Sequence, residues 1–419
     1  MPLLVMKFGG TSVADLSRIR RAAERVSDNV TNGYNIIVVV SAMAGKTNEL
    51  IASVTGTSAV YDAREYDAIV STGENITAGL MALTLQDMSI PARSWQGWQV
   101  PINTSMVHAS ARIESIPIEN ISRKFTDGMR VAVVSGFQGL SAEGRITTLG
   151  RGGSDTTAVA LAAAFNAEQC QIYTDVSGVY TTDPRICSKA RKLDRIAYEE
   201  MLELASLGAK ILQTRSIELA MRYHVNLRVM SSFDENHDVH GTLVCDEEKD
   251  MENKVVAGVA YSRDEAKLTL TSVADRPGIA AIIFGALGDV GVNVDMIVQN
   301  ISEDGRTDMT FSCPTNQLPL AQKALDAIKF GGKLNYSELL TDVDVAKVSV
   351  VGIGMRSHTG VAAKMFKVLS EEGINIKVIT TSEIKISVLI DRKYMELAVQ
   401  ILHHAFGLDA VENNSVKSH

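Results

Sequence analysis

The motif MKFGGTSV near the N-terminus joins a lysine to two glycines, a combination that suits a phosphate group. Lys7 ends an apolar run, and Gly9 and Gly10 follow it closely. Glycine lets the backbone approach a phosphate, and its amide donates hydrogen bonds to the oxygens. A lysine at the end of a strand reaches the same oxygens as a point charge. For this motif alone, a plain strand and turn with a solvated lysine is the alternative.

A second loop, in IIVVVSAMAGKTNEL (36–50), ends in the Gly-Lys-Thr of a nucleotide-binding P-loop. That motif also requires a glycine five residues before Gly45, and Val40 stands there. The P-loop interpretation therefore fails. A strand that runs into a loop of small residues still suits an anion.

The segment TTLGRGGSDTTAVALAAA (147–164) places three glycines in a turn ahead of an alanine-rich helix. Ser154 or Asp155 is a suitable N-cap for that helix. Arg151 lies within the turn, where its guanidinium fork could hold a carboxylate. A glycine-rich turn with a helix cap is the alternative, but it leaves Arg151 without a role.

Three further segments carry isolated polar side chains of interest. In IYTDVSGVYTTDPRI, Tyr180 and Asp175 would suit an adenine or ribose site, unless the segment is only a surface loop. In STGENITAGL, Glu74 could hold an ammonium group or simply favour a helix N-terminus. Lys210, in GAKILQTRSIELA, is predicted at the start of a helix. The alternative to a functional role is a lysine that is simply exposed to solvent.

These motifs need a scaffold that brings them together, and the first 230 residues predict one. Strands are predicted at 3–8, 36–41, 130–135, 171–174 and 227–230, and helices at 17–29, 63–85, 155–165 and 198–223. Strands that alternate with helices indicate a mainly parallel sheet covered on both faces. Ligands of such sheets bind at the carboxyl ends of the strands, so the motif loops should converge there.

The rest of the chain contains an internal repeat. RPGIAAIIFGALGDVGVNVDMIVQN, from Arg276, aligns without gaps to HTGVAAKMFKVLSEEGINIKVITTS, from His358. Each copy is followed by a β-rich stretch, at 306–313 and 384–390, which gives half of a βαββαβ pattern twice. Chance similarity of two amphipathic helices is the alternative. The acidic stretch 234–254 is predicted to be the domain junction, or else a long surface loop.

The length, charge and cysteine content of the chain argue against several classes of protein. A chain of 419 residues predicts two or three domains, and a net charge of −8 argues against nucleic acid or an anionic membrane as the main partner. The four cysteines are scattered without a C-x-x-C motif, which favours reduced thiols in the cytoplasm over a disulfide framework or metal site. We expect no signal peptide and no membrane span, because no uncharged apolar stretch reaches about 18 residues.

Taken in order, KFGGTS, SAMAGKTNEL, STGEN, TLGRGGSDTTAVALA, YTDVSGVYTTDPR and GAK resemble the aspartokinase family. The tandem repeat resembles the paired ACT domains of that family, so the resemblance covers nearly the whole chain. TLGRGGSDTTA with TDPR is the specific part, whereas KFGG is shared with the wider amino acid kinase family.

The resemblance implies an α/β fold with a three-layer αβα kinase domain over 1–245, followed by two ferredoxin-like ACT domains. The first ACT domain would occupy 265–340, and the second would combine 255–264 with 345–410. The family reaction converts ATP and L-aspartate to 4-phospho-L-aspartate, with Mg²⁺. It is the first step towards lysine, threonine and methionine.

By resemblance, Lys7, Asp155 and Lys210 would be catalytic, with Asp155 orienting the lysines. The residues implied to hold ATP are Lys7, Phe8, Gly9, Gly10, Thr174, Asp175, Tyr180, Arg185, Lys210 and Ile211. Those implied to hold aspartate are Ser41, Thr47, Glu74, Arg151 and Ser154, with Glu74 on the ammonium group and Arg151 with Ser154 on the α-carboxylate. The chain departs from many family members at Gln213-Thr214, where they have His-Pro.

ACT pairs bind amino acids, and threonine, lysine or both are the expected feedback inhibitors. The allosteric residues implied by resemblance are Asp275, Gly278, Ile279, Ala280, Asn293, Asp295, Gln299, Gly360, Val361, Asn375, Ile376, Thr381, Ser382 and Glu383. The resemblance also implies that the chain forms a homodimer, or an assembly with a separate ACT-only chain.

Two other functions compete with the aspartokinase prediction. One is a different amino acid kinase, acting on acetylglutamate or glutamate, against which the ACT pair and TLGRGGSDTT argue. The other is a non-catalytic amino-acid sensor, against which the intact set of Lys7, Arg151, Asp155 and Lys210 argues.

Overall fold

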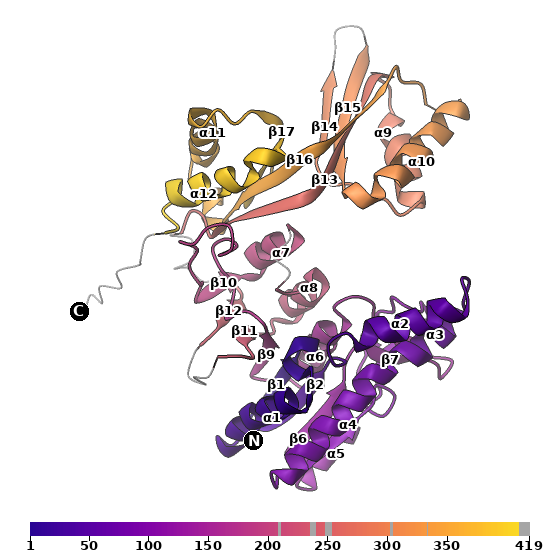
Figure 1. Ribbon diagram of the computed structural model, residues 1–419, viewed down its shortest axis with the longest axis vertical. Helices are drawn as coiled ribbons and strands as arrows, with labels where there is room; N and C mark the ends of the chain where they lie inside the picture. The colour runs from indigo at the N-terminus through magenta and orange to yellow at the C-terminus, as the bar shows by residue number, and fades with distance from the viewer. Residues whose placement is uncertain (208–210, 235–239, 248–253, 302–304, 333, 410–419) are drawn as a thin grey trace, which may run out of the picture. The chain divides into compact units, whose positions relative to one another are not determined.

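The chain folds into two units (Figure 1). The computed structural model describes residues 1–207, 211–234, 240–247, 254–301, 305–332 and 334–409. The first unit comprises Met1–Val179 and Lys192–Glu248, and the second comprises Tyr180–Arg191 and Lys249–His419. The short segment Tyr180–Arg191 thus belongs to the second unit, although no sequence pattern predicts this.

An eight-stranded, mainly parallel sheet forms the centre of the first unit. Its order is β10-β12-β11-β9-β1-β2-β6-β3, and among its described strands β11 and β12 are the one antiparallel pair. The bounds are β1 Leu3–Phe8, β2 Asn35–Val40, β3 Ala92–Trp95, β6 Val131–Ser135, β9 Gln169–Thr174, β10 Arg195–Ala197, β11 Leu227–Ser231 and β12 Thr242–Cys245. The central strands are almost wholly apolar and buried, as expected where helices cover both faces.

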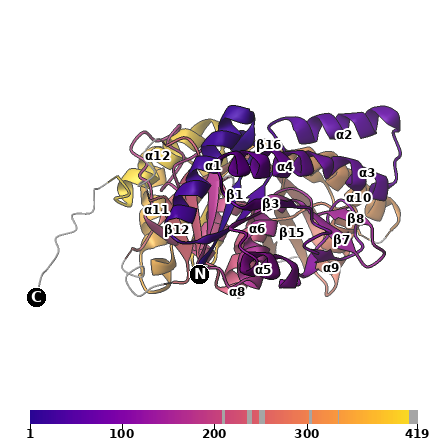
Figure 2. The ribbon, with the colours of Figure 1, turned by 90° about the horizontal axis from the view of Figure 1, so that it is seen from below.

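Helices cover the two faces of this sheet. α1 (Leu16–Thr31) and α4 (Thr72–Asp87) lie on one face, and α6 (Gly153–Ala164) lies on the other (Figure 2). Residues 153–162 of α6 are all buried, which explains why this helix is alanine-rich on every side. The predicted αβα layering is confirmed.

Two predicted helices are divided in the structure. The helix expected over 63–85 is α3 (Ala63–Val70) followed by α4. Ser71 Oγ and Thr72 Oγ1 donate to the carbonyls of Ala68 and Ile69, at 3.3 and 2.7 Å, and these bonds compete with the helical pattern. The helix expected over 198–223 is α7 (Tyr198–Ser206) and α8 (Thr214–Tyr223).

Two further predictions need correction. Ser154 and Asp155 do not cap α6, because Gly152 occupies the N-cap and both residues lie in the first helical turn. The acidic stretch 234–254 is not wholly a junction, because β12 lies within it and pairs with β10 and β11. Its apolar segment Leu243–Cys245 is too short to stand out among acidic neighbours.

A second, four-stranded sheet also belongs to the first unit and was not predicted. Its order is β5-β4-β7-β8, and the bounds are β4 Asn103–Thr104, β5 Ile113–Ser115, β7 Gln138–Ser141 and β8 Ile146–Thr148. α3 packs on β8, and two more helices complete the unit: α2 (Lys46–Thr57) and α5 (Glu119–Thr126).

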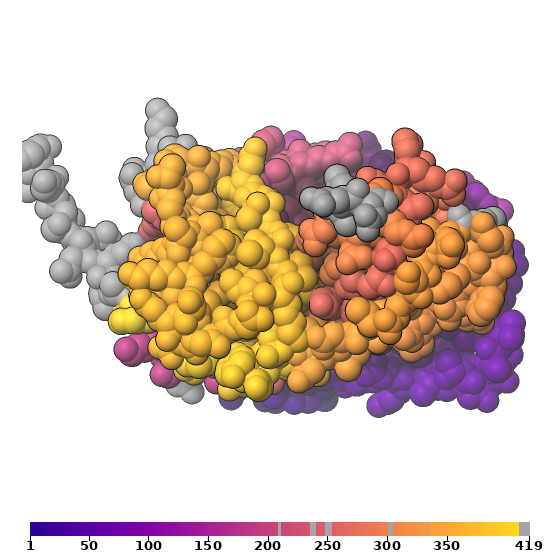
Figure 3. Space-filling model, turned by 90° about the horizontal axis from the view of Figure 1, so that it is seen from above, coloured from indigo at the N-terminus to yellow at the C-terminus, as the bar shows by residue number. Residues whose placement is uncertain are grey.

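The second unit is built on one antiparallel sheet of order β14-β15-β13-β16-β18-β17. The strand bounds are β13 Gly258–Ala274, β14 Ile297–Ile301, β15 Arg306–Cys313, β16 Leu339–Val351, β17 Ile376–Thr381 and β18 Lys385–Asp391. The helices are α9 Ile279–Asp289, α10 Leu318–Phe330, α11 Val361–Glu371 and α12 Met395–Ala405. The two largest apolar cores among the described residues of this unit mark two modules, which Figure 3 shows as adjoining orange and yellow lobes.

The sequence repeat corresponds to a repeated turn in the two modules. Gly278 and Gly360 are the N-cap residues of α9 and α11, with φ of 94° and 91°. Only glycine adopts this backbone region without strain, which accounts for their identity in the two copies. The long β13 serves both modules, since Gly258–Ser262 pairs with Lys347–Val351 and its C-terminal half pairs with β15.

The four cysteines are buried and form no disulfide. Within the described residues, no helix combines the length and the apolar character that crossing a membrane requires.

Candidate active site

The carboxyl ends of the parallel strands of the first unit lie along one edge of its sheet. Backbone hydrogen bonds connect the loops that leave them: Gly9 N donates to Tyr173 O at 3.3 Å, Ser41 N to Phe8 O at 3.1 Å, and Gly136 N to Val40 O at 3.0 Å. The loops that follow β1, β2, β6 and β9 are therefore held together. This is the edge where the sequence placed the ligand site.

Lys7 and Asp155 form a nearly buried ion pair at this edge. Lys7 Nζ lies 2.5 Å from Asp155 Oδ1, and the side chains are 11% and 10% exposed. Lys7 comes from the end of β1 and Asp155 from the first turn of α6. A Cβ on Gly9 would lie 3.5 Å from the same Nζ, so the ammonium group sits beside the glycine loop. The pair fixes a cation next to backbone amides, which suits a phosphoryl group.

Glu74 is a buried carboxylate with one unused oxygen. Oε1 accepts from Ala42 N at 3.0 Å, whereas Oε2 has no hydrogen-bond partner among the described residues. Burial raises the pKa of Glu74 from 4.5 to about 7. The approach is close because the preceding residue is a glycine: a Cβ on Gly73 would lie 2.7 Å from Ala42 Cβ. An ammonium ligand would satisfy Oε2 and favour the charged carboxylate.

The α6 N-terminus supplies Ser154 and the loop that carries Arg151. Ser154 is buried against Gly136, where a Cβ would lie 2.8 Å from Ser154 Oγ. Arg151 is exposed, between Gly150 and Gly152, whose φ angles are 77° and 72°. The exposed guanidinium is therefore presented on a short loop that enters α6 directly.

The two remaining residues that were predicted to hold aspartate, Ser41 and Thr47, are both half-buried. Ser41 follows β2, and Thr47 lies in the first turn of α2. The neighbouring Lys46 pairs with Glu49 at 2.6 Å. Gln213, at the departure from the family pattern, packs against the α6 loop. A Cβ on Gly152 would lie 1.9 Å from its Cγ.

The predicted nucleotide residues are divided between the units. Thr174 ends β9, and its Oγ1 donates to Asp175 Oδ1 at 3.1 Å. Tyr180 belongs to the second unit, as does Arg185, whose guanidinium pairs with Asp183 at 2.8 Å. The structure thus does not bring these two into one unit with Lys7. Lys210 lies outside the described residues, and Ile211 is half-buried.

Several residues of this edge were missed by the sequence reasoning. They are Ser12, whose Oγ lies 2.5 Å from Ser232 Oγ, and Ala42, Ser135 and Gly136. The Ser135 hydroxyl is buried and has no partner among the described residues. The sequence could have pointed to Ala42, Ser135 and Gly136 only through their position, because they lie at the ends of predicted strands.

The predicted allosteric residues lie at corresponding places in the two modules of the second unit. One group surrounds the N-termini of α9 and α11, and the other follows these helices into the outer strands β14 and β17. Asp295 is already engaged, since it pairs with the buried Lys347, which also holds Glu265 at 2.8 Å. Gln299 is exposed on β14.

Comparison with known proteins identifies the first unit. A model of the amino acid kinase family matches residues 2–231, and the aspartate kinase of Stutzerimonas stutzeri (strain A1501) is 51% identical over 418 residues, covering 100% of both chains. The chain belongs to the aspartate kinases. Models of the ACT domain match residues 268–330 and 348–406, so the modules of the second unit are ACT domains.

Solved aspartate kinases share the fold. Escherichia coli aspartokinase III in complex with aspartate and ADP (R-state) is 28% identical, with a TM-score of 0.79, and the match covers 96% of this chain and 99% of that one. The same enzyme with lysine and aspartate (T-state) is 28% identical, with a TM-score of 0.76, and covers 96% and 99%. This aspartate kinase is therefore an ATP-dependent enzyme that phosphorylates aspartate and carries ACT domains for allosteric regulation.

Proposed function

We propose that the enzyme transfers the γ-phosphoryl group of ATP to the β-carboxylate of L-aspartate, as the first step towards lysine, threonine and methionine. A β-carboxylate oxygen attacks the phosphorus, the bond to the bridging oxygen breaks, and 4-phospho-L-aspartate and ADP result. The nucleophile is already ionised at neutral pH, so the reaction needs no general base. Catalysis then depends on positioning and on neutralising charge.

The Lys7–Asp155 pair is the observation that carries this proposal. An ammonium group that a buried carboxylate holds beside Gly9 needs little reorganisation when charge develops on the phosphoryl oxygens. Lys7 would neutralise that charge, with the amides of Gly9 and Gly10 as further donors. The other proposed nucleotide contacts remain those implied by the family: Phe8, Thr174, Asp175, Tyr180, Arg185, Lys210 and Ile211.

Glu74 supports aspartate over acetylglutamate as the substrate. Its unused Oε2 is buried, and a free ammonium group can pair with it, whereas an acetylated amine carries no charge. Arg151 and Ser154 would hold the α-carboxylate, and Ser41 and Thr47 would line the same pocket. Glutamate is one methylene longer, which would displace its carboxylate from the phosphoryl group.

Mg²⁺ is the expected companion of ATP. Among the described residues, no group of three or more His, Cys, Asp or Glu side chains is arranged to hold a metal ion. Mg²⁺ that accompanies a nucleotide is usually held mainly by phosphates and water, with one or two carboxylates. When bound, the ion would neutralise phosphate charge.

Regulation and assembly are proposed from the ACT modules. Threonine, lysine or both would act as feedback inhibitors, and the E. coli enzyme solved with lysine supports a lysine site. Among the described residues, the outer strands β14 and β17 each pair with one neighbouring strand of the unit's sheet. A homodimer, or an assembly with an ACT-only chain, would cover such edges. A cytoplasmic location is consistent with the free cysteines.

An ADP-release assay with hydroxylamine trapping of the acyl phosphate tests the reaction. The purified enzyme should turn over L-aspartate and show little activity with L-glutamate or N-acetyl-L-glutamate, and a Lys7→Met variant is the control for contaminating kinases. Preferred turnover of another substrate would contradict the proposal, and inactivity on all three would favour an amino-acid sensor.

A further inference from the structure

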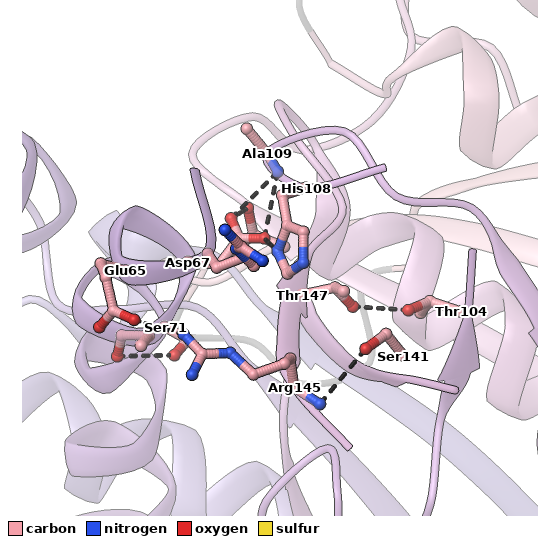
Figure 4. A network of polar contacts seen from close by, with 12 residues as sticks. Glu65, Asp67, Ser71, Thr104, His108, Ala109, Ser141, Arg145 and Thr147 are labelled. Carbon is pink, nitrogen blue, oxygen red and sulfur yellow. Dashed lines mark hydrogen bonds and ion pairs between the residues drawn. The ribbon is translucent and has the colours of Figure 1, made fainter. Parts of the chain in front are cut away.

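A buried carboxylate outside the proposed site, that of Asp67 on α3, holds together the segments on which Arg151 depends. Asp67 is 0% exposed, and its oxygens accept hydrogen bonds from three residues that are distant in sequence. Thr148 Oγ1 donates at 2.5 Å, Ala109 N lies 3.1 Å from both oxygens, and His108 Nδ1 lies 2.7 Å from Oδ2. Figure 4 shows the carboxylate pointing at Ala109 and His108.

The first path from Asp67 to the Arg151 loop runs through Thr148. This residue ends β8 and is fully buried, and Leu149 and Gly150 follow it directly. The bond to Asp67 therefore fixes the strand end only three residues before Arg151. Arg215 fixes the next residue, since its Nη1 donates to Leu149 O at 2.9 Å.

The second path runs through the turn at Ala109. Ala109 has a φ of 63°, a left-handed conformation that costs free energy for any residue except glycine. The Asp67 oxygens hold this conformation in place by accepting from its amide. The carbonyl of the same residue lies only 3.2 Å from where a Cβ on Gly150 would stand, so the turn packs directly against the loop. Both paths thus meet at Gly150, next to Arg151.

Asp67 is also linked to the other end of the amino-acid site. α3 continues through Ser71 into α4, whose first turn carries Glu74. Gln138 Nε2 donates to Ser71 O at 2.9 Å, and this bond anchors the junction to β7. A single buried side chain therefore connects the helix that leads to Glu74 with the loop that carries Arg151.

We propose that Asp67 is a positioning residue for aspartate: it sets the distance between the carboxylate of Glu74 and the guanidinium of Arg151. This inference rests on the proposed roles of those two residues. It predicts that loosening the Asp67 contacts weakens aspartate binding while ATP binding is preserved, because Lys7 and the glycine loop are held by β1 and α6 instead.

Two variants test the inference, each with a matched control. Thr148→Val removes the donor without changing side-chain volume, and Thr148→Ser restores the hydroxyl. Asp67→Asn removes the charge and keeps the shape. Glu65→Gln is the control for α3, because Glu65 pairs with Arg145 at 2.5 Å on the same helix but at its exposed surface.

Thr148→Val and Asp67→Asn should raise the KM for aspartate about tenfold or more, since small misplacements of binding groups are costly. The KM for ATP should stay within about twofold by the same argument. Thr148→Ser and Glu65→Gln should both resemble the wild type. A structural role alone would lower the Tm and leave both KM values unchanged, or change both together, and either result would overturn the inference.

If Asp67→Asn does not fold, the Thr148 pair decides the question alone. Arg151→Ala, measured in parallel, distinguishes a failure of the Asp67 role from a failure of the proposed aspartate site. A raised aspartate KM in Arg151→Ala with normal values in Thr148→Val and Asp67→Asn overturns only the role of Asp67. An unchanged aspartate KM in Arg151→Ala overturns the proposed site and this inference with it.

Discussion

Lys7 Nζ lies 2.5 Å from Asp155 Oδ1, although one residue lies near the end of β1 and the other in the first turn of α6. Both side chains are almost fully buried, so water competes little for either charge. The carboxylate keeps the ammonium group beside Gly9 before any ligand arrives. This preorganisation is the feature that makes the strand edge suitable for phosphoryl transfer.

Removing Lys7 should therefore reduce catalysis more than binding. Lys7→Met should lower kcat by about 10²–10³-fold, the usual cost of losing one transition-state donor. Asp155→Asn should lower kcat by about tenfold, because the cation remains but loses its fixed position. Steady-state kinetics would measure both values. Lys124→Met, at an exposed lysine that pairs with Asp127, is the control, and wild-type kcat in Asp155→Asn would refute the role of the pair.

Glu74 should give the aspartate reaction a characteristic pH dependence. Because burial raises its pKa to about 7, the free enzyme holds a neutral side chain below that pH and a carboxylate above it. Only the carboxylate attracts the substrate ammonium group, so kcat/KM for aspartate should fall as the pH drops through about 7. In Glu74→Gln the value should be low, and this limb of the pH profile should disappear. If kcat/KM for aspartate still falls below about pH 7 in Glu74→Gln, the pH dependence belongs to another titrating group.

The sequence could predict the edge of the sheet at which the site lies. Lys7 lies near the end of a predicted strand and Arg151 shortly before a predicted helix, and parallel strands bring their carboxyl ends to one edge. The pairing of Lys7 with Asp155 was anticipated only by resemblance. What spacing alone could not show is the role of backbone groups, such as the Ala42 amide that holds Glu74.

Local side-chain bonds and tertiary contacts decided the parts that the sequence missed. The helix over 63–85 divides where the hydroxyls of two adjacent residues bond back to the backbone, which the apolar pattern of the sequence does not reveal. Tyr180–Arg191 looked like a continuation of the kinase domain. It joins the second unit because Val259 N donates to Thr181 O at 2.8 Å and Gln400 Nε2 donates to Ile186 O at 2.7 Å.

Gln299 offers a test of regulation. It is exposed on the outer strand β14, at a position that the resemblance assigns to effector binding. Gln299→Ala should raise the inhibitory concentration of threonine or lysine about tenfold, within the range of typical allosteric coupling, without lowering the basal rate. Asn300→Ala is the control, because neighbouring side chains on a strand point to opposite faces. Inhibition that persists unchanged in Gln299→Ala would remove the residue from the effector site.

His403 should make the stability of the second unit depend on pH. It is 1% exposed, and its Nε2 lies 2.8 Å from Thr181 Oγ1. Burial lowers the pKa of His403 below 6.5 despite the nearby Asp409, while Arg191, His404 and Lys189 reinforce the shift. The unfolded chain therefore takes up a proton at a higher pH than the folded chain does, and stability is lost as the pH falls through about 6.5 and below.

Thermal unfolding between pH 8 and 5.5 would measure this loss. The wild type should lose more Tm than His403→Gln, by about 2–4 °C for each kcal/mol of proton linkage. His404→Gln is the control, since His404 is largely exposed. Equal slopes for the wild type and His403→Gln would contradict the assignment.

The central claim is that this strand edge grips aspartate at both its ammonium group and its α-carboxylate while Lys7 meets the phosphoryl group. Calorimetric titration of L-aspartate into the wild type, Arg151→Ala, Glu74→Gln and Lys7→Met measures it most directly. Arg151→Ala and Glu74→Gln should each weaken aspartate binding about tenfold or more, as expected when a charged group of the ligand loses its partner, whereas Lys7→Met should bind aspartate normally but not turn it over. Undiminished aspartate binding in both Arg151→Ala and Glu74→Gln would contradict it.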